Sequence, residues 1–181
     1  MAQGHKDKVA VITGGANGIG QAFAKRLAED GVHIAVVDIA DGSDTVKLVE
    51  AAGRQAIYVK TDVSSEASVA AMAKEVSAKF SHVDIVVNCA GIFPQKDFAE
   101  MSFADWRKVL STNLDSTFLV SAAFVPGMRQ RKWGRVVNMA SSTLGSVVTG
   151  FAHYVASKGG IVGFTRALAS DLAGDGITVN A

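Results

Sequence analysis

Short runs of apolar, mostly β-branched residues alternate along this chain with longer stretches in which apolar residues recur at helical spacing. The short runs are nearly continuous rather than alternately apolar and polar, which is typical of strands covered on both faces of a sheet. The pattern predicts six such strands, at Lys8–Thr13, His33–Asp38, Gln55–Lys60, Val83–Asn88, Arg135–Ala140 and Ile177–Asn180.

The intervening stretches carry apolar residues three or four positions apart, which puts those residues on one face of an α-helix. The clearest helical faces are formed by Ile19, Phe23 and Leu27, by Val69, Met72, Val76 and Phe80, and by Ile161, Phe164, Leu168 and Leu172. The segment Ser102–Gln130 is long enough for a helix with a bend. We expect that helix to stop near Pro126, because proline lacks the amide that continues a helix.

Strict alternation of strands and helices predicts an α/β fold, a Rossmann-type doubly wound parallel sheet with helices on both faces. The length of 181 residues predicts one domain over residues 1–181. In such sheets ligands bind outside the carboxyl ends of the strands, where the strand order reverses. The first predicted strand runs there into the glycine-rich stretch TGGANGIG, residues 13–20.

Composition and charge exclude several classes of partner. The formal net charge is +1 and no basic tract is present, which argues against a nucleic-acid groove or a polybasic membrane patch. The single cysteine cannot form an internal disulfide, and the four histidines show no metal-ligand spacing. The stretch MAQGHKDK lacks the apolar core of a signal peptide. We therefore expect a cytoplasmic protein with no metal, membrane or nucleic-acid partner.

The glycine turn raises the question of why so many side chains are missing. Glycine is needed where φ is positive or where another group must approach the backbone closely. A tight turn with a helix cap would satisfy the first need, whereas a pyrophosphate at the start of a helix would satisfy the second. Asp38, at the end of the second predicted strand, could accept both ribose hydroxyls of an adenosine and would repel a 2′-phosphate. Together the turn and Asp38 predict a dinucleotide site that prefers NAD.

Tyr154 and Lys158 stand four residues apart, on one face of a predicted helix. A free tyrosine is a poor base at neutral pH, but a lysine ammonium nearby favours the phenolate. Tyr154 could then exchange a proton with an alcohol or a ketone. His153 adjoins Tyr154, but neighbours on a helix diverge by about 100°, so we expect His153 to face elsewhere.

Taken in order, these motifs resemble the short-chain dehydrogenase/reductase family over essentially the whole chain. TGxxxGIG is similar to the cofactor turn of that family, and the resemblance implies cofactor contacts from Gly14, Asn17, Gly18, Ile19 and Gly20. Asp62-Val63 resembles its adenine-contacting pair. Asn88-Cys89-Ala90-Gly91 resembles its Asn-Asn-Ala-Gly motif, which implies cofactor contacts from Asn88, Ala90 and Gly91.

The resemblance also implies a catalytic set of Asn113, Ser141, Tyr154 and Lys158. In this set Ser141 holds the substrate oxygen, Lys158 also binds the nicotinamide ribose, and Asn113 positions a water behind Lys158. Spacing from Asn138 and Tyr154 favours Ser141 over its neighbour Ser142.

The predicted function is an NAD-dependent dehydrogenase that interconverts a secondary alcohol and a ketone. Within the family the chain looks most like bacterial NAD-dependent secondary alcohol dehydrogenases, such as the 1-phenylethanol dehydrogenases. The substrate-lining segments Ile92–Phe98 and Thr143–Phe151 are largely apolar, which fits a hydrophobic small-molecule substrate. A 3-oxoacyl-acyl-carrier-protein reductase is the alternative within the family, although Asn17 stands where those enzymes carry a basic residue. A non-catalytic dinucleotide-binding sensor or scaffold is the alternative of another class.

Two further expectations come from the resemblance alone. Pairing of the Ser102–Gln130 and Tyr154–Ala173 helices between subunits implies a homo-oligomer, a dimer or a homotetramer. Family members continue beyond the point at which this sequence ends. We therefore expect residues 1–181 to lack the C-terminal part of a longer enzyme, with the sixth strand as an unpaired edge and an open cleft around Ser141 and Tyr154.

Overall fold

The computed structural model describes residues 4–181, which contain six strands and six α-helices. The strands are β1 Val9–Thr13, β2 His33–Asp38, β3 Ala56–Lys60, β4 Ile85–Asn88, β5 Gly134–Asn138 and β6 Ile177–Asn180. The helices are α1 Gly18–Glu29, α2 Ser43–Ala51, α3 Glu66–Lys79, α4 Phe103–Leu110, α5 Ser116–Arg131 and α6 Ala152–Leu172. Strands and helices alternate along the chain, except that two helices, α4 and α5, lie between β4 and β5. Short helical segments of other types lie at Phe98–Glu100, Ser111–Asp115, Ser142–Gly145 and Ala173–Asp175.

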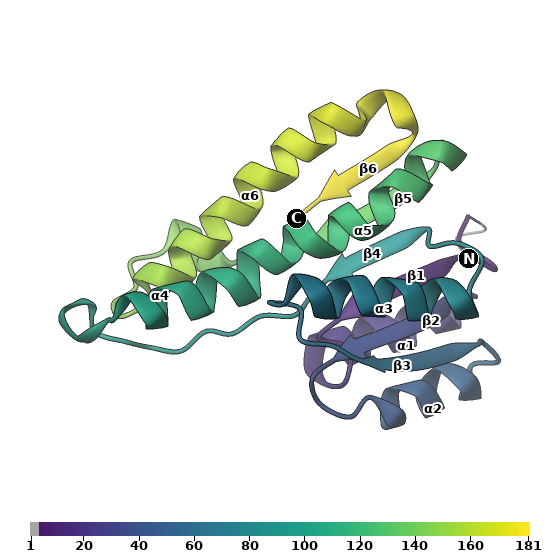
Figure 1. The fold of residues 1–181 in the computed structure, drawn as a ribbon, viewed down its shortest axis with the longest axis horizontal. Helices are drawn as coiled ribbons and strands as arrows, with labels where there is room; N and C mark the ends of the chain where they lie inside the picture. The colour runs from purple at the N-terminus through teal and green to yellow at the C-terminus, as the bar shows by residue number, and fades with distance from the viewer. Residues whose placement is uncertain (1–3) are drawn as a thin grey trace.

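All six strands run parallel and adjoin in the order β3-β2-β1-β4-β5-β6, so β3 and β6 are the edge strands (Figure 1). The strand order reverses between β1 and β4, and the glycine turn follows β1 at that point. The predicted doubly wound α/β fold is therefore confirmed. Each of the six strands lies within two residues of its predicted bounds.

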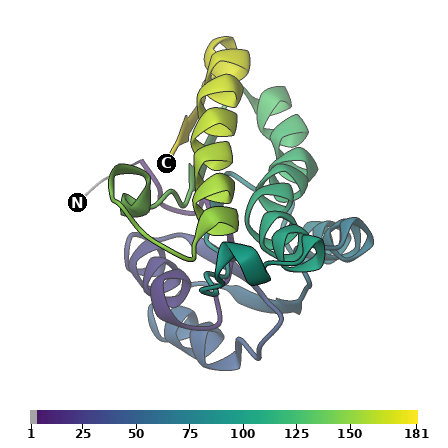
Figure 2. The ribbon, with the colours of Figure 1, turned by 90° about the vertical axis from the view of Figure 1, so that its left-hand side faces the viewer.

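Helices cover both faces of the sheet (Figures 1 and 2). One core joins α3, α5 and α6 to the face that carries Val11 and Val86, and the other joins α1 and α2 to the face that carries Ile12 and Val87. Adjacent strand residues thus enter opposite cores, which is why the strands are apolar without alternation. None of the helices described between residues 4 and 181 combines the length and the apolar composition that a membrane span requires.

The expectation that Pro126 stops its helix is wrong, because α5 continues to Arg131. Pro126 and Ala122, whose carbonyl loses its helical donor at Pro126, are both exposed, so water can satisfy that carbonyl. The helix ends at Arg131, and the residue that follows it, Lys132, has a φ of 56°, in the left-handed region. The long predicted helix is interrupted earlier instead, by a π-helical turn at Ser111–Asp115 between α4 and α5.

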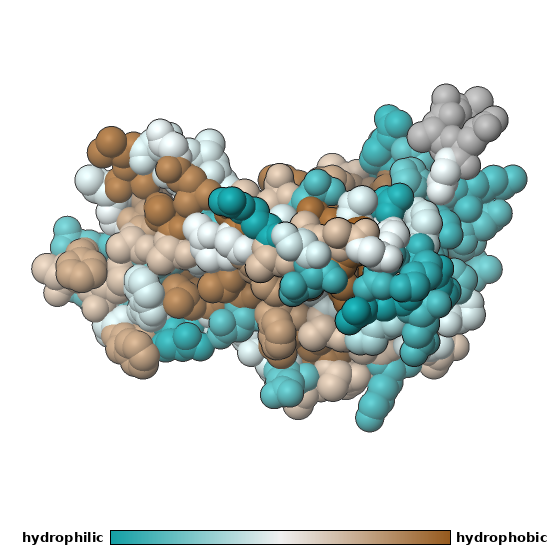
Figure 3. Space-filling model, turned by 90° about the horizontal axis from the view of Figure 1, so that it is seen from above, coloured by the Kyte–Doolittle hydropathy of each residue, from teal (hydrophilic) through white to brown (hydrophobic). Residues whose placement is uncertain are grey.

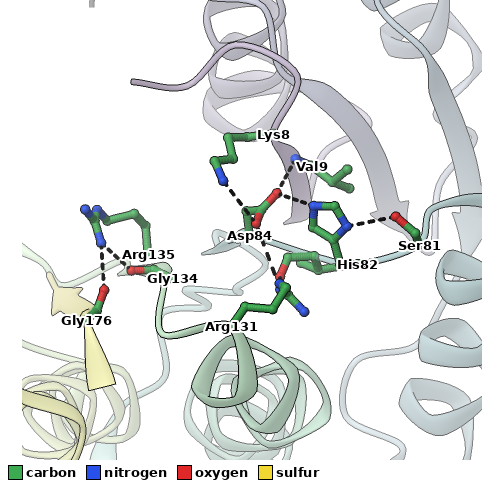
Figure 4. A network of polar contacts seen from close by, with 10 residues as sticks. Lys8, Val9, Ser81, His82, Asp84, Arg131, Gly134, Arg135 and Gly176 are labelled. Carbon is green, nitrogen blue, oxygen red and sulfur yellow. Dashed lines mark hydrogen bonds and ion pairs between the residues drawn. The ribbon is translucent and has the colours of Figure 1, made fainter. Parts of the chain in front are cut away.

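A buried carboxylate ties together the amino ends of β1 and β4 (Figure 4). The glycine turn lies at the other, carboxyl end of β1. Asp84 accepts a hydrogen bond from the Val9 amide at 3.1 Å and lies 3.2 Å from His82 Nε2. Lys8 Nζ and an Arg131 guanidinium nitrogen lie 3.6 and 3.9 Å from its other oxygen. Because a buried charge is tolerated only when it is paired, these contacts fix the entry of the chain into both central strands.

Candidate functional site

Glycine is required in the turn for two reasons, a positive φ at some positions and close approach of other backbone at others. Gly14 and Gly18 have φ values of 65° and 54°, which favour glycine. A Cβ on Gly20 would lie 2.1 Å from the Gly14 carbonyl oxygen, and a Cβ on Gly14 would lie 2.9 Å from the Ala90 backbone. The turn is therefore packed so tightly against itself and the end of β4 that side chains are excluded, and it leaves bare backbone where α1 begins.

Asp38 leaves the carboxyl end of β2 and reaches the same turn. One carboxylate oxygen accepts a hydrogen bond from the Ala16 amide at 3.0 Å, and the other accepts one from the Ala40 amide at 3.0 Å. Asp38 is half-buried and lines the cavity described next, so its negative charge is held beside the bare backbone of the turn.

A cavity of about 690 Å³ extends across the carboxyl ends of the strands. Most of the predicted site residues line it, namely Gly14, Asn17, Ile19, Gly20, Asp38, Asp62, Val63, Ala90, Gly91, Tyr154 and Lys158. Four predicted residues, Gly18, Asn88, Asn113 and Ser141, are not part of its lining. Ile92 and Phe93, from the predicted substrate-lining segment, and Cys89, from the motif that begins at Asn88, also line it. The other lining residues were not singled out from the sequence, and they are Ile39, Thr61, Ser64, Lys108, Ser111, Thr112, Met139 and Ala140.

Tyr154 and Lys158 come together on α6 as their spacing predicts. Lys158 Nζ lies 5.6 Å from the centroid of the Tyr154 ring and donates a hydrogen bond to the Met139 carbonyl at 2.6 Å. Only 6% of Lys158 is exposed, and this burial lowers the pKa of its ammonium. The carbonyl of Met139 fixes the lysine, but backbone acceptors have no residue-type signal, so the sequence could not reveal this contact.

Asn113 is buried in the π-helical turn and holds the loop that follows β4. Its side-chain oxygen accepts from the Ile92 amide at 2.8 Å, and its side-chain nitrogen donates to the Ile92 carbonyl at 2.9 Å and to Ser157 Oγ at 3.1 Å. A Cβ on Gly91 would lie 3.3 Å from the Asn113 side-chain oxygen and 3.9 Å from Lys158 Nζ. Asn113, Gly91 and Lys158 are therefore brought together, with Asn113 behind the cavity wall.

Asn88 lies behind the cavity rather than along it. Its side-chain nitrogen donates to the Asn138 side-chain oxygen at 2.8 Å and to Ser121 Oγ at 3.2 Å, which links β4 to β5 and α5. The backbone after Asn88 is held by Thr13, whose hydroxyl accepts from the amides of Cys89 and Ala90, each at 3.1 Å. No pattern along the chain predicts this role of Thr13.

Ser141 follows β5 and caps the short segment Ser142–Gly145. Its hydroxyl oxygen accepts from the Thr143 amide at 3.2 Å and from the Thr143 hydroxyl at 2.9 Å. Within the described part of the chain, the structure gives no hydrogen bond between Ser141 and Tyr154. The predicted contact of Ser141 with a substrate therefore stays a prediction.

Comparison with known proteins identifies the family. The family model described as short chain dehydrogenase matches residues 8–181. This chain belongs to the short-chain dehydrogenase family.

Relatives of this short-chain dehydrogenase include both dehydrogenases and reductases. It is 39% identical to nodulation protein G of Azospirillum brasilense, over 96% of this chain and 72% of that protein. It is 38% identical to cis-4-hydroxycyclohexanecarboxylate dehydrogenase of Sinomonas cyclohexanicum, over 100% of this chain and 74% of that enzyme. It is also 38% identical to a 3-oxoacyl-acyl-carrier-protein reductase of Pseudomonas aeruginosa, over 96% of this chain and 71% of that enzyme.

A solved structure of NAD⁺-bound xylitol dehydrogenase has a TM-score of 0.93 and 32% sequence identity to this short-chain dehydrogenase, covering 98% of this chain and 70% of that one. The motif resemblance is thus confirmed at the level of the family. The chain is an oxidoreductase of the short-chain dehydrogenase type.

Burial of Lys158 predicts a pH dependence of folding stability in this short-chain dehydrogenase. The pKa of Lys158 is lowered from its ordinary value of 10.5 chiefly by desolvation, so between the lowered pKa and 10.5 the unfolded chain binds a proton that the folded chain does not. Stability contributed in this way rises with pH across that window. Relative to Lys158→Met, the wild type should therefore gain free energy of unfolding as the pH increases.

Urea unfolding of both proteins at several pH values between neutrality and 10.5 measures this gain. Lys74→Met removes an exposed lysine of α3 and controls for the loss of one positive charge. The prediction would be contradicted if the difference in free energy of unfolding between wild type and Lys158→Met stayed constant over this pH range.

Proposed function

We propose that this chain transfers a hydride between NAD(H) and a secondary alcohol or its ketone, with Tyr154 as the general base and acid. The observation that carries the proposal is the Tyr154–Lys158 pair on one face of α6, beside a cavity that also takes in the glycine turn and Asp38. Hydride transfer coupled to a proton needs three parts. These are a base (Tyr154), a cation beside that base (Lys158), and a cavity that reaches from the base to the bare backbone of the glycine turn.

The residues around the cavity fit a nicotinamide dinucleotide. The turn Gly14–Gly20 would hold the pyrophosphate, since side chains are excluded there and the N-terminus of α1 supplies free amides. Asp38 would accept the ribose hydroxyls of the adenosine, and Asp62 and Val63 would contact the adenine. When bound, the cofactor supplies the hydride acceptor or donor. The similarity to NAD⁺-bound xylitol dehydrogenase supports this assignment.

Tyr154 would take a proton from the alcohol during oxidation and return it to the ketone during reduction. The Lys158 ammonium, 5.6 Å from the ring centroid, would stabilise the phenolate that forms. Ser141 would hold the substrate oxygen. Asn113 would position a water behind Lys158 and, through its two hydrogen bonds to Ile92, keep the cavity wall in place.

The surroundings of Tyr154 favour an apolar substrate. The rings of Phe93 and Phe151 meet the Tyr154 ring edge-on, with centroids 6.3 and 6.1 Å away. The nearby loop exposes Leu144, Val147 and Val148. Seen from above, hydrophobic residues gather toward the end of the molecule where α6 begins, whereas the opposite end is largely hydrophilic (Figures 1 and 3). The proposed substrate class is therefore a hydrophobic secondary alcohol or ketone.

The reductase alternative is favoured by the 38% identity to a 3-oxoacyl-acyl-carrier-protein reductase. Initial rates with NAD and NADP across secondary alcohols of graded size, and with a 3-oxoacyl thioester in the reverse direction, separate the two candidates. Turnover of hydrophobic alcohols with NAD supports the proposal. Turnover of the thioester alone, with NADPH, supports the reductase, and no turnover with any of these substrates supports a non-catalytic dinucleotide-binding protein.

Asp38 should make the chain prefer NAD. A 2′-phosphate would lie against a half-buried carboxylate, and such like-charge contacts cost several kcal/mol, so kcat/KM for NAD should exceed that for NADP by about a hundredfold or more. Asp38→Asn should reduce the preference for NAD over NADP, because it removes the negative charge. Its side-chain oxygen can still accept a hydrogen bond from one of the two amides, of Ala16 or Ala40, that Asp38 binds. Asp41→Asn, an exposed position three residues on, is the matched control. Equal kcat/KM values for the two cofactors in the wild type would rule out this role of Asp38.

A homo-oligomer is part of the proposal. Phe118 of α5 is 56% exposed and its ring meets that of Phe164 of α6 edge-on at 6.4 Å, so the two helices present a shared apolar surface. Pairing of this surface between two copies of the chain would bury it, and large exposed apolar patches often mark such protein–protein contacts. Light scattering of the purified chain tests for a dimer or tetramer.

A further inference from the structure

A second cavity, of about 500 Å³, lies next to the cofactor cavity and shares with it the loop residues Gly91, Ile92 and Phe93 and also Lys108 of α4. Its remaining walls come from the loop up to Lys96, from α4 and from His153 at the start of α6. Tyr154, Lys158 and Ser141 do not line it. The proposed hydride-transfer chemistry makes no use of this cavity.

His153 brings a buried donor to this cavity. The residue is fully buried, and its Nδ1 accepts the Tyr154 amide at 2.9 Å, an amide of the first helical turn that has no helical acceptor. Because Nδ1 is the acceptor, the proton of the neutral ring is on Nε2. Nε2 has no hydrogen-bond partner among residues 4–181, although it is fully buried. A side chain that lines the cavity thus carries a buried N–H donor that has no partner among the described residues.

The charged residues around His153 leave an excess of positive charge. Lys96 and Lys108 line the cavity, and neither forms an ion pair within 4.0 Å in the described part of the chain. The only carboxylate in the lining is Asp105, and one of its oxygens already accepts from the amide and hydroxyl of Ser102, at 3.0 and 2.7 Å. Two lysines therefore face one carboxylate that is partly engaged elsewhere.

The rest of the lining is apolar and is held in place. Ile92, Phe93, Pro94 and Val109 supply hydrocarbon surface. Asn113 fixes the Ile92 backbone from behind, and the Lys96 amide donates to the Gly150 carbonyl at 2.8 Å, which ties the outer end of the loop to the segment before α6. The cavity is therefore formed by a loop anchored at both ends.

We infer that this second cavity binds a small apolar carboxylate. Its carboxylate would accept from His153 Nε2 and face Lys108, and its hydrocarbon part would pack on Ile92 and Val109. The source is either a separate acid or a carboxylate arm on the substrate itself. The inference rests on the cavity and not on the proposed reaction, so it stands whichever substrate the enzyme takes.

Benzoate is the probe, and benzamide is its neutral counterpart of the same shape. In NMR spectra of the ring nitrogens of the four histidines, benzoate should shift the His153 Nε2 signal, which is absent from His153→Asn. Asparagine can still accept the Tyr154 amide near the position of Nδ1, but it lacks the outer donor. Lys108→Gln removes a charge at an exposed position, and Lys74→Gln is the matched control.

Benzoate should bind the wild type and Lys74→Gln alike, and about tenfold or more weakly to His153→Asn and Lys108→Gln, as loss of a hydrogen bond to a charged group implies. Binding that saturating alcohol and NADH leave intact identifies a separate acid, and competition with the alcohol identifies a substrate arm; either result supports the inference. Absence of a shift, equal binding of benzamide, or unchanged affinity in both variants overturns it. A wild type that turns over alcohols without binding benzoate overturns this inference alone and leaves the proposed function standing.

Discussion

Replacing Tyr154 by phenylalanine is expected to lower kcat about a thousandfold, within the usual contribution of general acid–base catalysis. The substitution removes one hydroxyl and keeps the ring that packs against Phe93 and Phe151, so the cavity should retain its shape. The dissociation constant for NADH should therefore change little. Steady-state kinetics with a secondary alcohol, together with fluorescence titration of NADH, measures the two effects separately.

The chain offers a matched control for this substitution, because it has only one other tyrosine. Tyr58 lies in β3, and its hydroxyl is 3.5 Å from the Asp38 carbonyl. Tyr58→Phe removes the same atom on the adenosine side of the proposed site and should keep kcat near the wild-type value. If Tyr154→Phe retained a tenth of the wild-type kcat, a different residue would have to transfer the proton.

The sheet could be predicted from the sequence because its signal is local and repeated. Val11 and Ile12 enter opposite cores, as do Val86 and Val87, and only a strand covered on both faces makes consecutive residues equally apolar. The glycine turn and the Tyr154–Lys158 pair were predictable for a similar reason. In both cases a short spacing along the chain specifies the geometry.

Contacts made by backbone atoms could not be predicted in this way. The Met139 carbonyl orients Lys158 and the Ile92 backbone is held by Asn113, yet nothing in the side chains of Met139 or Ile92 signals either contact. The π-helical turn that carries Asn113 was also missed, because such turns are rare and the residues before and after it are helical.

Long-range polar contacts were likewise out of reach. The cluster around Asp84 joins Lys8 and Arg131, which are more than a hundred residues apart in the sequence, and their neighbours in the sequence look like ordinary surface segments. His153 was expected only to face away from Tyr154. Its position against α4, and the donor it brings to the second cavity, depend on how two distant helices pack.

The second large effect is expected from adding a single methyl group at Gly20. A Cβ there would lie 2.1 Å from the Gly14 carbonyl oxygen, far inside van der Waals contact, so α1 or the turn must shift. Overpacking of this kind costs about 3 kcal/mol or more when backbone has to move. Gly20→Ala should therefore lose roughly that much free energy of unfolding. Because the same shift moves the amides proposed to hold the pyrophosphate, NADH affinity should fall as well.

Gly163→Ala is the matched control, since Gly163 is also a helical glycine but its added Cβ would meet nothing within 4 Å. In that open position alanine should stabilise the helix by about 0.5–1 kcal/mol, because it restricts the unfolded chain more than glycine does. The two substitutions add the same atom and should move stability in opposite directions in urea unfolding, with only Gly20→Ala weakening NADH binding. Wild-type stability in Gly20→Ala would show that the turn has room for a side chain, and its glycines would then have to be explained by backbone conformation alone.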